Sequence, residues 1–372
     1  MGKIGNVSTV LQEKVRSMEG GRRTTLLSSG MIAIYQTITT LARAGDEIVV
    51  SANLRPEVYD LFNIMLRDMG VTINFVQSAK AHDYIVAISP RTRFIFLDAE
   101  GGLVPQVFEI SEIAYIAHKY KIPLVVDAGG MSPHFKPLEL GADIVIRDFE
   151  LLCGTRICTG GAVTEAGNFD WRTSNVLMIK AGDPCCNGIR WAFDLPKEDA
   201  AVAFSMRLQH VMTRIFSSSL SGPSAFYIWD NIENIFMRCE RKYVNAMAVA
   251  KLLEKSDEIA WVAYPPLTEN CAKAKVYGKC NTSVGFAFKG TKEESLRKTR
   301  AFFERLQNIV ICPQRLSNQS AIFALGMRKN DSLVSYSDPS LPPLYENSIR
   351  FIAGIEETSV IRKSISNALK GL

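Results

Sequence analysis

The sequence predicts an α/β protein in which helices cover both faces of a largely parallel sheet, followed by a smaller α+β domain. Two observations support this prediction. In the first half, short apolar runs alternate with segments whose apolar residues recur at helical spacing. After Gly222-Pro223 the alternation stops and one long helical pattern begins. Ligands of such sheets gather where the parallel strands end, so polar residues at these ends are the first candidates for a site.

Six apolar runs of strand length fall in the first half, and two segments of helix length lie between them. The helical segments are Glu57–Met69 and Ile110–Lys121. Asp98, Asp127 and Arg147 each close a predicted strand, which places them at the edge where a ligand is expected. The predicted strands are Glu47–Ser51, Val71–Val76, Arg93–Asp98, Pro123–Asp127, Asp143–Arg147 and Gly161–Thr164.

The second half begins with a continuous helical pattern from Ala225 to about Lys255, which is typical of a helix that joins two domains. We therefore expect an N-terminal segment over residues 1–20, a large domain over 21–236 and a small C-terminal domain over 237–372. The stretch Asp331–Pro343 is typical of a loop. In the small domain the predicted strands are Ile259–Tyr264, Thr282–Phe288, Ile309–Ile311 and Ser348–Phe351, and the predicted helices are Glu293–Leu306 and Ser359–Leu369.

The composition argues against several functional classes. The 372 residues carry a net charge of +5, with Lys and Arg interspersed among Asp and Glu, so nucleic-acid binding is not indicated. No apolar run approaches the ~18 residues that a membrane span needs. The eight cysteines form no CxxC pair and lie near no histidine at zinc spacing. This pattern favours free thiols, so we expect a cytoplasmic protein without a metal.

Six short motifs occur in order along the chain: Ile4-Gly5-Asn6, Glu19-Gly20-Gly21 with Ser28-Ser29-Gly30-Met31, Ala44-Gly45-Asp46, Pro123–Asp127, Gly141–Val145 and Arg350–Glu356. Together they resemble the pyridoxal-phosphate (PLP) enzymes of cysteine and methionine metabolism, most of all the O-acetylhomoserine sulfhydrylase and methionine γ-lyase branch. The resemblance implies a PLP-transferase-like large domain with a mostly parallel seven-stranded sheet between helices, and a smaller α+β C-terminal domain. It implies less about activity, because one fold carries many functions.

Within this resemblance, three parts of the PLP site are kept. Asp127 matches the aspartate that pairs with the pyridine nitrogen, and Ser29-Gly30-Met31 matches the phosphate loop. Arg350 matches the arginine that holds the substrate carboxylate. Each has a structural alternative that needs no ligand. Asp127 can cap the turn after its strand, Ser29 can cap a helix, and Arg350 can pair with Glu356.

The turn that carries the Schiff-base lysine in the family is altered in this chain. The lysine position is Leu151, which can neither form an imine nor transfer a proton. Two hydroxyl positions beside the phosphate hold Asp148 and Glu150 instead. A carboxylate repels a phosphate by roughly a kcal/mol or more per pair even at intermediate dielectric. The ring-stacking tyrosine is replaced by Arg55, although Tyr59 is near it in the sequence.

Three further positions differ, and no substitute lysine is evident. Ala128 and Gly129 replace the family's asparagine and threonine after Asp127, and Cys186 replaces the tyrosine of a substrate-facing loop. Lys180 lies in a different segment from the altered turn. We therefore expect no catalytic residue, and a vestigial cofactor pocket formed by Ser29, Gly30, Met31, Arg55, Asp127, Asp148 and Glu150, with Arg350 as the candidate for carboxylate binding.

These departures imply a catalytically degenerate homologue that binds no PLP and acts through assembly. It would form a homodimer or homotetramer, or a hetero-oligomer with an active PLP-binding paralogue. The alternative is an active sulfhydrylase or C–S lyase with an altered pocket.

The residues of the altered pocket also suggest two other chemistries. Its carboxylates, Asp127, Asp148 and Glu150, could hold a hard cation. Ion pairing of these carboxylates with arginines is the favoured interpretation. The candidate arginines are Arg55, Arg147 and Arg156. The pair Cys185-Cys186 could form a reactive thiol site, but no histidine stands at a spacing that supports it.

Overall fold

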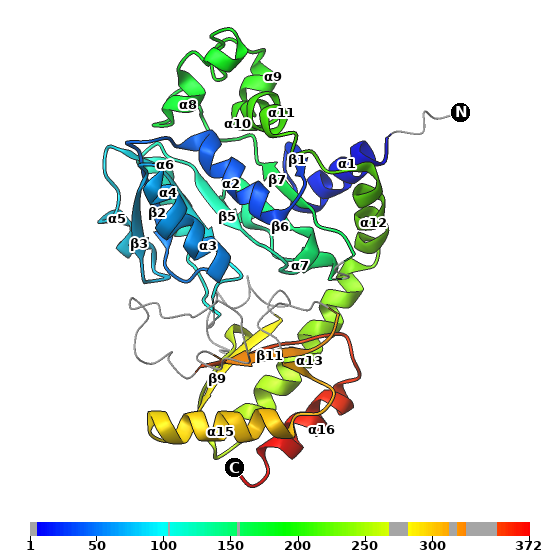
Figure 1. Ribbon diagram of the computed structural model, residues 1–372. Helices are drawn as coiled ribbons and strands as arrows, with labels where there is room; N and C mark the ends of the chain where they lie inside the picture. Colours follow the sequence, from blue (N-terminus) through cyan, green and yellow to red (C-terminus); the bar gives the residue numbers. More distant parts are fainter. Residues whose placement is uncertain (1–5, 103–104, 155–156, 268–281, 312–317, 325–347) are drawn as a thin grey trace. The chain divides into compact units, whose positions relative to one another are not determined.

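The computed structural model describes residues 6–102, 105–154, 157–267, 282–311, 318–324 and 348–372. It divides into two compact units (Figure 1). The first comprises Met1–Glu100 and Phe108–Glu233, and the second comprises Gly101–Val107 and Asn234–Leu372. The predicted boundary between the two domains followed residue 236, whereas the second unit begins at Asn234. The prediction also did not assign 101–107 to the second unit. The predicted loop Asp331–Pro343 lies outside the described residues.

The first unit is built on a seven-stranded sheet with the order β1-β7-β6-β5-β4-β2-β3. The five central and outer strands from β6 to β3 run parallel, whereas β7 is antiparallel to both β6 and β1. This arrangement confirms the predicted mostly parallel α/β class. The strands are β1 (Arg23–Leu27), β2 (Glu47–Ser51), β3 (Thr72–Val76), β4 (Thr92–Asp98), β5 (Leu124–Asp127), β6 (Ile144–Asp148) and β7 (Gly161–Glu165).

Strand β1 was not predicted, because its first half is polar. Thr24 and Thr25 interrupt the apolar run, yet both are buried against β7. The hydroxyl oxygens of Thr24 and Thr164 lie 2.8 Å apart, so the polar side chains satisfy each other across the strand pair.

Helices cover this sheet (Figure 1). α2 packs against β6 and β7, and α6 packs against β5. Both sheet faces are therefore apolar, and Phe94, Phe96 and Ile144 are fully buried. The helices of this unit are α1 (Val7–Glu19), α2 (Gly30–Leu41), α3 (Pro56–Asp60), η1 (Leu61–Met65), α4 (Leu66–Asp68), α5 (Ala81–Ile85), α6 (Ile110–Lys119), η2 (Pro137–Leu140), α7 (Phe149–Cys153), α8 (Leu177–Lys180), η3 (Pro184–Cys186), α9 (Lys197–Ala200), α10 (Ala203–Arg207), η4 (Leu208–Thr213), α11 (Arg214–Phe216) and α12 (Gly222–Ile232).

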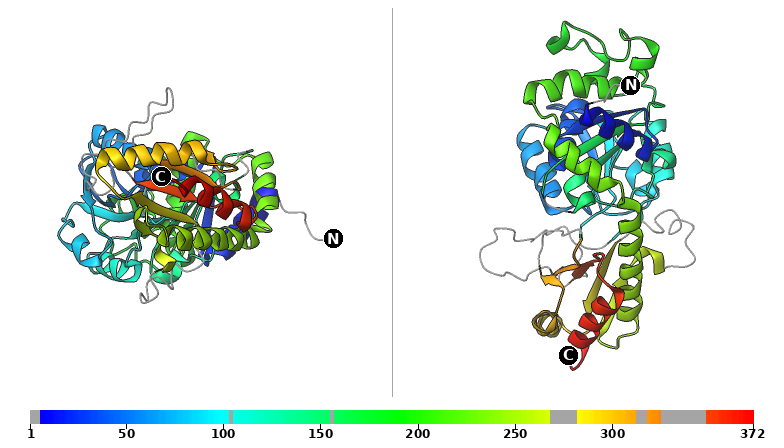
Figure 2. Two further views of the ribbon diagram at one scale, coloured as in Figure 1. Left: turned by 90° about the horizontal axis from the view of Figure 1, so that it is seen from below. Right: turned by 90° about the vertical axis from the view of Figure 1, so that its right-hand side faces the viewer.

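In its described residues, the second unit has a five-stranded sheet with the order β10-β11-β12-β9-β8, and the helices α13, α15 and α16 pack beside it (Figures 1 and 2). The predicted helix from 225 to 255 is two helices, since α12 and α13 are separated at Glu233-Asn234. Strand β11 was not predicted. The elements are α13 (Ile235–Glu254), β8 (Ile259–Ala263), η5 (Pro265–Leu267), β9 (Ser283–Phe288), α15 (Lys292–Arg305), β10 (Val310–Ile311), β11 (Ala321–Ala324), β12 (Ile349–Ile352) and α16 (Thr358–Leu369).

Candidate active site

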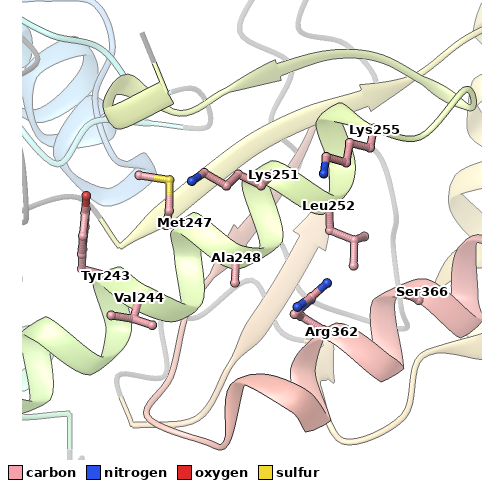
Figure 3. A pocket seen from close by; sticks show the side chains of 9 residues that line it. All are labelled: Tyr243, Val244, Met247, Ala248, Lys251, Leu252, Lys255, Arg362 and Ser366. Atoms are coloured by element: carbon pink, nitrogen blue, oxygen red, sulfur yellow. The ribbon is translucent and has the colours of Figure 1, made fainter. Parts of the chain in front are cut away.

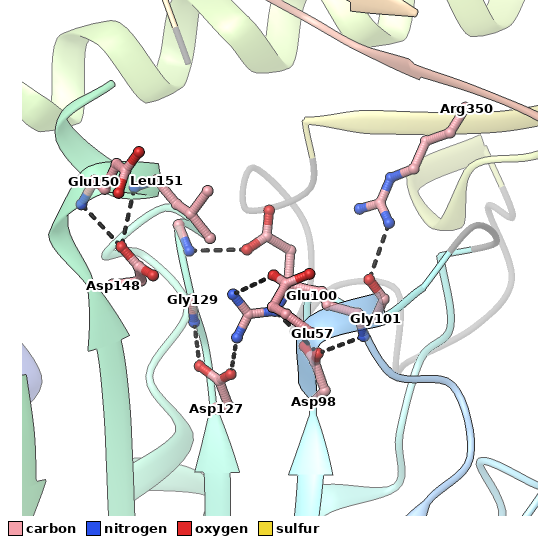
Figure 4. A network of polar contacts seen from close by, with 12 residues as sticks. Glu57, Asp98, Glu100, Gly101, Asp127, Gly129, Asp148, Glu150, Leu151 and Arg350 are labelled. Atoms are coloured by element: carbon pink, nitrogen blue, oxygen red, sulfur yellow. Dashed lines mark hydrogen bonds and ion pairs between the residues drawn. The ribbon is translucent and has the colours of Figure 1, made fainter. Parts of the chain in front are cut away.

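The site in the first unit begins with two aspartates at the ends of neighbouring parallel strands. Asp98 ends β4 and Asp127 ends β5, and the two residues are direct partners in the strand ladder (Figure 4). Both are completely buried. Two carboxylates held side by side away from water repel each other, so a cation is needed between them.

Arg55 supplies that cation. Its backbone N–H and its Nε–H both donate to Oδ2 of Asp98, each at 3.1 Å. Its Nη2 group donates to Oδ2 of Asp127, and Glu57 lies 3.9 Å from Nη1. The Arg55 side chain is 2% exposed. Burial opposes its charge, but the carboxylates of Asp127 and Asp98 more than offset this and raise the pKa of Arg55.

Asp127 has a strongly perturbed acidity. Burial raises its pKa to about 7, while the Arg55 guanidinium opposes the rise and Asp98 adds to it. The N–H of Gly129 donates to its Oδ1 at 2.8 Å, so Asp127 also caps the turn that follows β5. Both oxygens of this carboxylate therefore already accept hydrogen bonds from the protein. The cap that the sequence offered as an alternative role for Asp127 is present.

Leu151 lies against the turn that follows Asp127. A Cβ atom added to Gly130 would lie 2.6 Å from Cβ of Leu151, so only glycine allows this approach. Glu100 faces the same turn, since the N–H of Gly130 donates to its carboxylate at 2.9 Å. Figure 4 shows the Leu151 side chain pointing away from Asp148 and Glu150. The position where the sequence locates the missing lysine thus lies beside the turn that Asp127 caps.

Asp148 joins the starts of two helices. Its Oδ1 accepts hydrogen bonds from the N–H groups of Glu150 at 2.9 Å and Leu151 at 3.2 Å, which caps α7. Its Oδ2 lies beside the first residue of α2, because a Cβ atom added to Gly30 would be only 2.1 Å from it. Burial raises the pKa of Asp148, and the Arg55 charge opposes the rise.

The phosphate-loop residues form the start of α2. Ser29 is the N-cap, and its hydroxyl accepts a hydrogen bond from the N–H of Ile32 at 3.1 Å. Gly30 is buried and Met31 is half-buried, and Met31 packs against the core of the unit. The helix-capping role that the sequence offered as an alternative for Ser29 is therefore present as well.

The arginines divide between the site and the core. Arg55 pairs with Asp98 and Asp127, as the ion-pair interpretation expected for the pocket carboxylates. Arg147 does not pair with them. Its guanidinium donates to Glu19 of α1 at 2.9 and 3.1 Å, and that pair is fully buried. Arg156 lies outside the described residues.

The remaining predicted residues lie in other surroundings. Tyr59 stacks on Phe75, with ring centroids 5.4 Å apart. The ammonium group of Lys180 donates to the carbonyl of Ser174 at 2.9 Å. Cys186 ends a short helical turn and packs at the edge of the core. Within the described ranges, no three His, Cys, Asp or Glu side chains are arranged to hold a metal ion.

Arg350 belongs to the second unit. It is buried on β12, and its guanidinium donates to the carbonyl of Gly101 at 2.9 Å and to the hydroxyl of Ser283 at 3.0 Å (Figure 4). Glu356, its expected alternative partner, accepts hydrogen bonds from the N–H and hydroxyl of Ser320.

A separate hollow of about 620 Å³ lies between α13 and α16 (Figure 3). Its lining contains three cationic side chains and no carboxylate, so it lacks the acid groups found around Asp127. The lining residues are Tyr243, Val244, Met247, Ala248, Lys251, Leu252, Lys255, Arg362 and Ser366.

Sequence reasoning placed Asp127 and Asp148 but gave no role to Glu100 or Glu19. Asp98 was noted only as a strand end. Its adjacency to Asp127 could have been inferred, because parallel strands that follow each other through a helix are usually neighbours. Glu19 stood only within the motif Glu19-Gly20-Gly21, with no indication of its partner, and Glu100 carried no signal.

Comparison with known proteins identifies the family. The sequence profile described as "Cys/Met metabolism PLP-dependent enzyme" matches residues 3–370. The chain belongs to this family. The homocysteine synthase of Schizosaccharomyces pombe is 30% identical over 299 residues, which cover 78% of this chain and 69% of that protein. An O-acetyl-L-homoserine sulfhydrylase of Leptospira meyeri is 29% identical over 325 residues, which cover 82% of this chain and 72% of that protein.

A solved structure also shares the fold of this Cys/Met metabolism family member. It is a putative O-acetylhomoserine (thiol)-lyase from Campylobacter jejuni, with a TM-score of 0.83 and 21% sequence identity, covering 98% of this chain and 86% of that one. It contains N'-pyridoxyl-lysine-5'-monophosphate. The predicted resemblance and fold class are thus confirmed.

The family membership corrects one expectation. The departures at Leu151, Asp148 and Glu150 led to the prediction that no cofactor is to be expected. That prediction is wrong, because the family is PLP-dependent and a protein of the same fold carries the cofactor. A match over residues 3–370 outweighs the loss of individual contacts.

Proposed function

We propose that this chain is a catalytically degenerate member of the O-acetylhomoserine sulfhydrylase branch that acts as a non-catalytic subunit in an oligomer. The observation that carries the proposal is Leu151. It stands in the first turn of α7, against the turn capped by Asp127, and an isobutyl group can neither form an imine nor move a proton. Lys180, the substitute that the sequence offered, is bonded to Ser174.

PLP is assigned to the site as a reversibly held ligand. When bound, PLP supplies an electron-accepting ring. Two elements of the site match its chemistry: the Asp127 carboxylate suits the ring nitrogen, and the start of α2 suits the phosphate. Leu151 does not match the covalent attachment. Arg350 remains our candidate for a substrate carboxylate, because it is buried on β12 and two of its partners, the carbonyl of Gly101 and the hydroxyl of Ser283, are neutral.

An active sulfur amino-acid enzyme with an altered pocket is the second candidate. Family membership and the retained Asp127 favour it. The two candidates differ in one property, which is whether a lysine of the chain becomes covalently joined to PLP.

The proposal is tested on the purified chain incubated with PLP. We expect no sulfide-dependent turnover of O-acetylhomoserine above the buffer rate, and no PLP adduct by intact-mass analysis after borohydride reduction. A lysine-containing sulfhydrylase, treated identically, is the positive control. Turnover together with a reduction-stable adduct mapped to a lysine would overturn the proposal in favour of the active enzyme.

The location is proposed as cytoplasmic. The described cysteines are free thiols, as expected in a reducing compartment. Among the described residues, no helix is long and apolar enough to span a membrane.

A further inference from the structure

We infer that Arg55 and Asp148 are internal competitors of PLP, occupying the two positions in the first unit where the cofactor's ring nitrogen and phosphate would be held. The inference rests on the proposed assignment of PLP to this site. It adds that the cofactor must displace two side chains of the chain itself before it can bind.

At the ring end, the competitor is a guanidinium. A protonated pyridine nitrogen offers one N–H and a positive charge to its aspartate, and Arg55 offers Asp127 the same kind of contact through Nη2. Arginine stays charged at every physiological pH, so this contact does not weaken by deprotonation. Arg55 is also held by two hydrogen bonds to Asp98, which keep it in place beside Asp127.

At the phosphate end, the competitor is a carboxylate. The start of a twelve-residue helix attracts an anion, because its first N–H groups lack helical acceptors and carry the positive end of the dipole. Oδ2 of Asp148 lies at this point, against Gly30. Oδ1 of the same side chain caps α7, so both helix starts share one negative group. A phosphate dianion brought to α2 would meet this carboxylate directly.

The two competitors are electrostatically linked. The Arg55 charge opposes the rise in the pKa of Asp148, and Asp148 adds to the rise in the pKa of Asp127. Arg55 is therefore stabilised by carboxylates at both ends of the site. Moving either side chain alone leaves buried charge less well compensated, which makes displacement costly.

The test separates the two ends by ligand and by variant. The phosphate end is opened by Asp148→Ser, since serine is also a good N-cap and keeps α7 capped. The ring end is opened by Arg55→Met combined with Asp98→Asn, which removes one charge of each sign. Dissociation constants are measured by equilibrium dialysis for PLP, pyridoxal and inorganic phosphate. The matched control is Arg207→Met with Asp183→Asn, another buried ion pair of this unit, with a 3.0 Å contact.

We expect D148S to bind PLP and inorganic phosphate at least tenfold more tightly than the wild type, with pyridoxal unchanged. We expect the R55M/D98N variant to bind PLP and pyridoxal at least tenfold more tightly, with phosphate unchanged. The control pair should leave all three constants as in the wild type. Folding of each variant is checked by circular dichroism, and D148S alone tests the phosphate end if the double variant does not fold.

Unchanged or weaker binding by a folded D148S would overturn the inference, as would an equal gain for pyridoxal and phosphate in either variant. These outcomes differ from failure of the proposed function, which is recognised by turnover and a lysine adduct in the wild type. If neither the wild type nor any variant binds PLP, pyridoxal or phosphate, internal competition is also contradicted.

Discussion

Leu151 alone does not explain the altered site, and this leads to a prediction at the level of single residues. We expect Leu151→Lys to show no sulfhydrylase turnover, because Asp148 and Glu150 still oppose the phosphate by roughly a kcal/mol or more each. The triple variant, which adds Asp148→Ser and Glu150→Ser, should restore covalent PLP attachment, measured by intact mass after borohydride reduction. Turnover by the single variant would show that the two carboxylates do not matter.

The Arg55 ion pair gives a second prediction, this one on stability. Arg55→Met should lower the free energy of unfolding at neutral pH by about 3–5 kcal/mol, because Asp98 and Asp127 are left as an uncompensated buried pair. Adding Asp98→Asn should recover part of the loss. Urea unfolding at pH 7.5 and pH 5.5 checks this. Arg55 opposes the rise in the pKa of Asp127, so without the arginine Asp127 holds its proton to higher pH in the folded state and the loss should shrink at pH 5.5. An equal loss at both pH values would contradict the explanation.

The positions of the site residues were predictable only where the chain itself carried the signal. Asp127 ends a predicted strand, so an apolar run located it, whereas Asp148 was located by the resemblance to the family's lysine turn. The partner of a buried arginine is set by packing between elements far apart in the sequence. Arg147 therefore paired with Glu19, 128 residues away, and not with the pocket carboxylates. Whether Arg55 stays with Asp127 or gives way to PLP depends on a difference of free energies, which no sequence pattern reports.

At the level of elements, burial decided which strands could be predicted. β4 and β5 each contain an uninterrupted apolar run, Phe94–Leu97 and Leu124–Val126, and were found within one residue. β1 was missed because Thr24 and Thr25 interrupt its apolar run, and the hydroxyl of Thr24 finds its partner, Thr164, only after pairing with β7. The predicted joining helix is interrupted at Glu233-Asn234. The sequence did not reveal this break, because the helical periodicity continues in phase across it.

Strand β7 ends in a buried acid that makes stability depend on pH. Glu165 accepts hydrogen bonds from Trp171 Nε1 at 2.7 Å and from the N–H of Ser205 at 2.8 Å. Burial nevertheless raises its pKa to about 7 from 4.5. The folded state thus holds this proton more tightly than the unfolded state, so the contribution of Glu165 to stability is greatest below pH 4.5. It is lost as the pH rises to about 7.

We expect Glu165→Gln to flatten the decline in stability between pH 4.5 and pH 7 by up to about 3 kcal/mol. Urea midpoints measured across this range test it. Glu198→Gln, at an exposed position in α9, is the control and should leave the profile as in the wild type. A Glu165→Gln profile parallel to that of the wild type would contradict the assignment.

At the level of the whole molecule, the fold and the family were recognisable from dispersed motifs, because these lie at turns and strand ends that the architecture requires. The predicted large domain includes 101–107, which the structure groups with the second unit, and nothing in the composition of this segment indicates that grouping. Function was harder to infer. The motifs that identify the family occur here in a chain whose predicted lysine position is Leu151, and a fold alone does not decide activity.

Under the proposed function, the chain has no Schiff-base lysine and acts on sulfur amino-acid chemistry through a subunit that has one. We therefore expect co-expression with a lysine-containing paralogue to give a mixed oligomer, resolved by native mass spectrometry as combinations of the 41.3 kDa chain with its partner. Turnover per lysine-bearing subunit in the mixed oligomer should differ from that of the paralogue alone, because neighbouring subunits alter each other's stability and sites. Each protein expressed separately is the control. Separate homo-oligomers with unchanged turnover would exclude the partner role and leave a self-associating chain whose activity must be sought elsewhere.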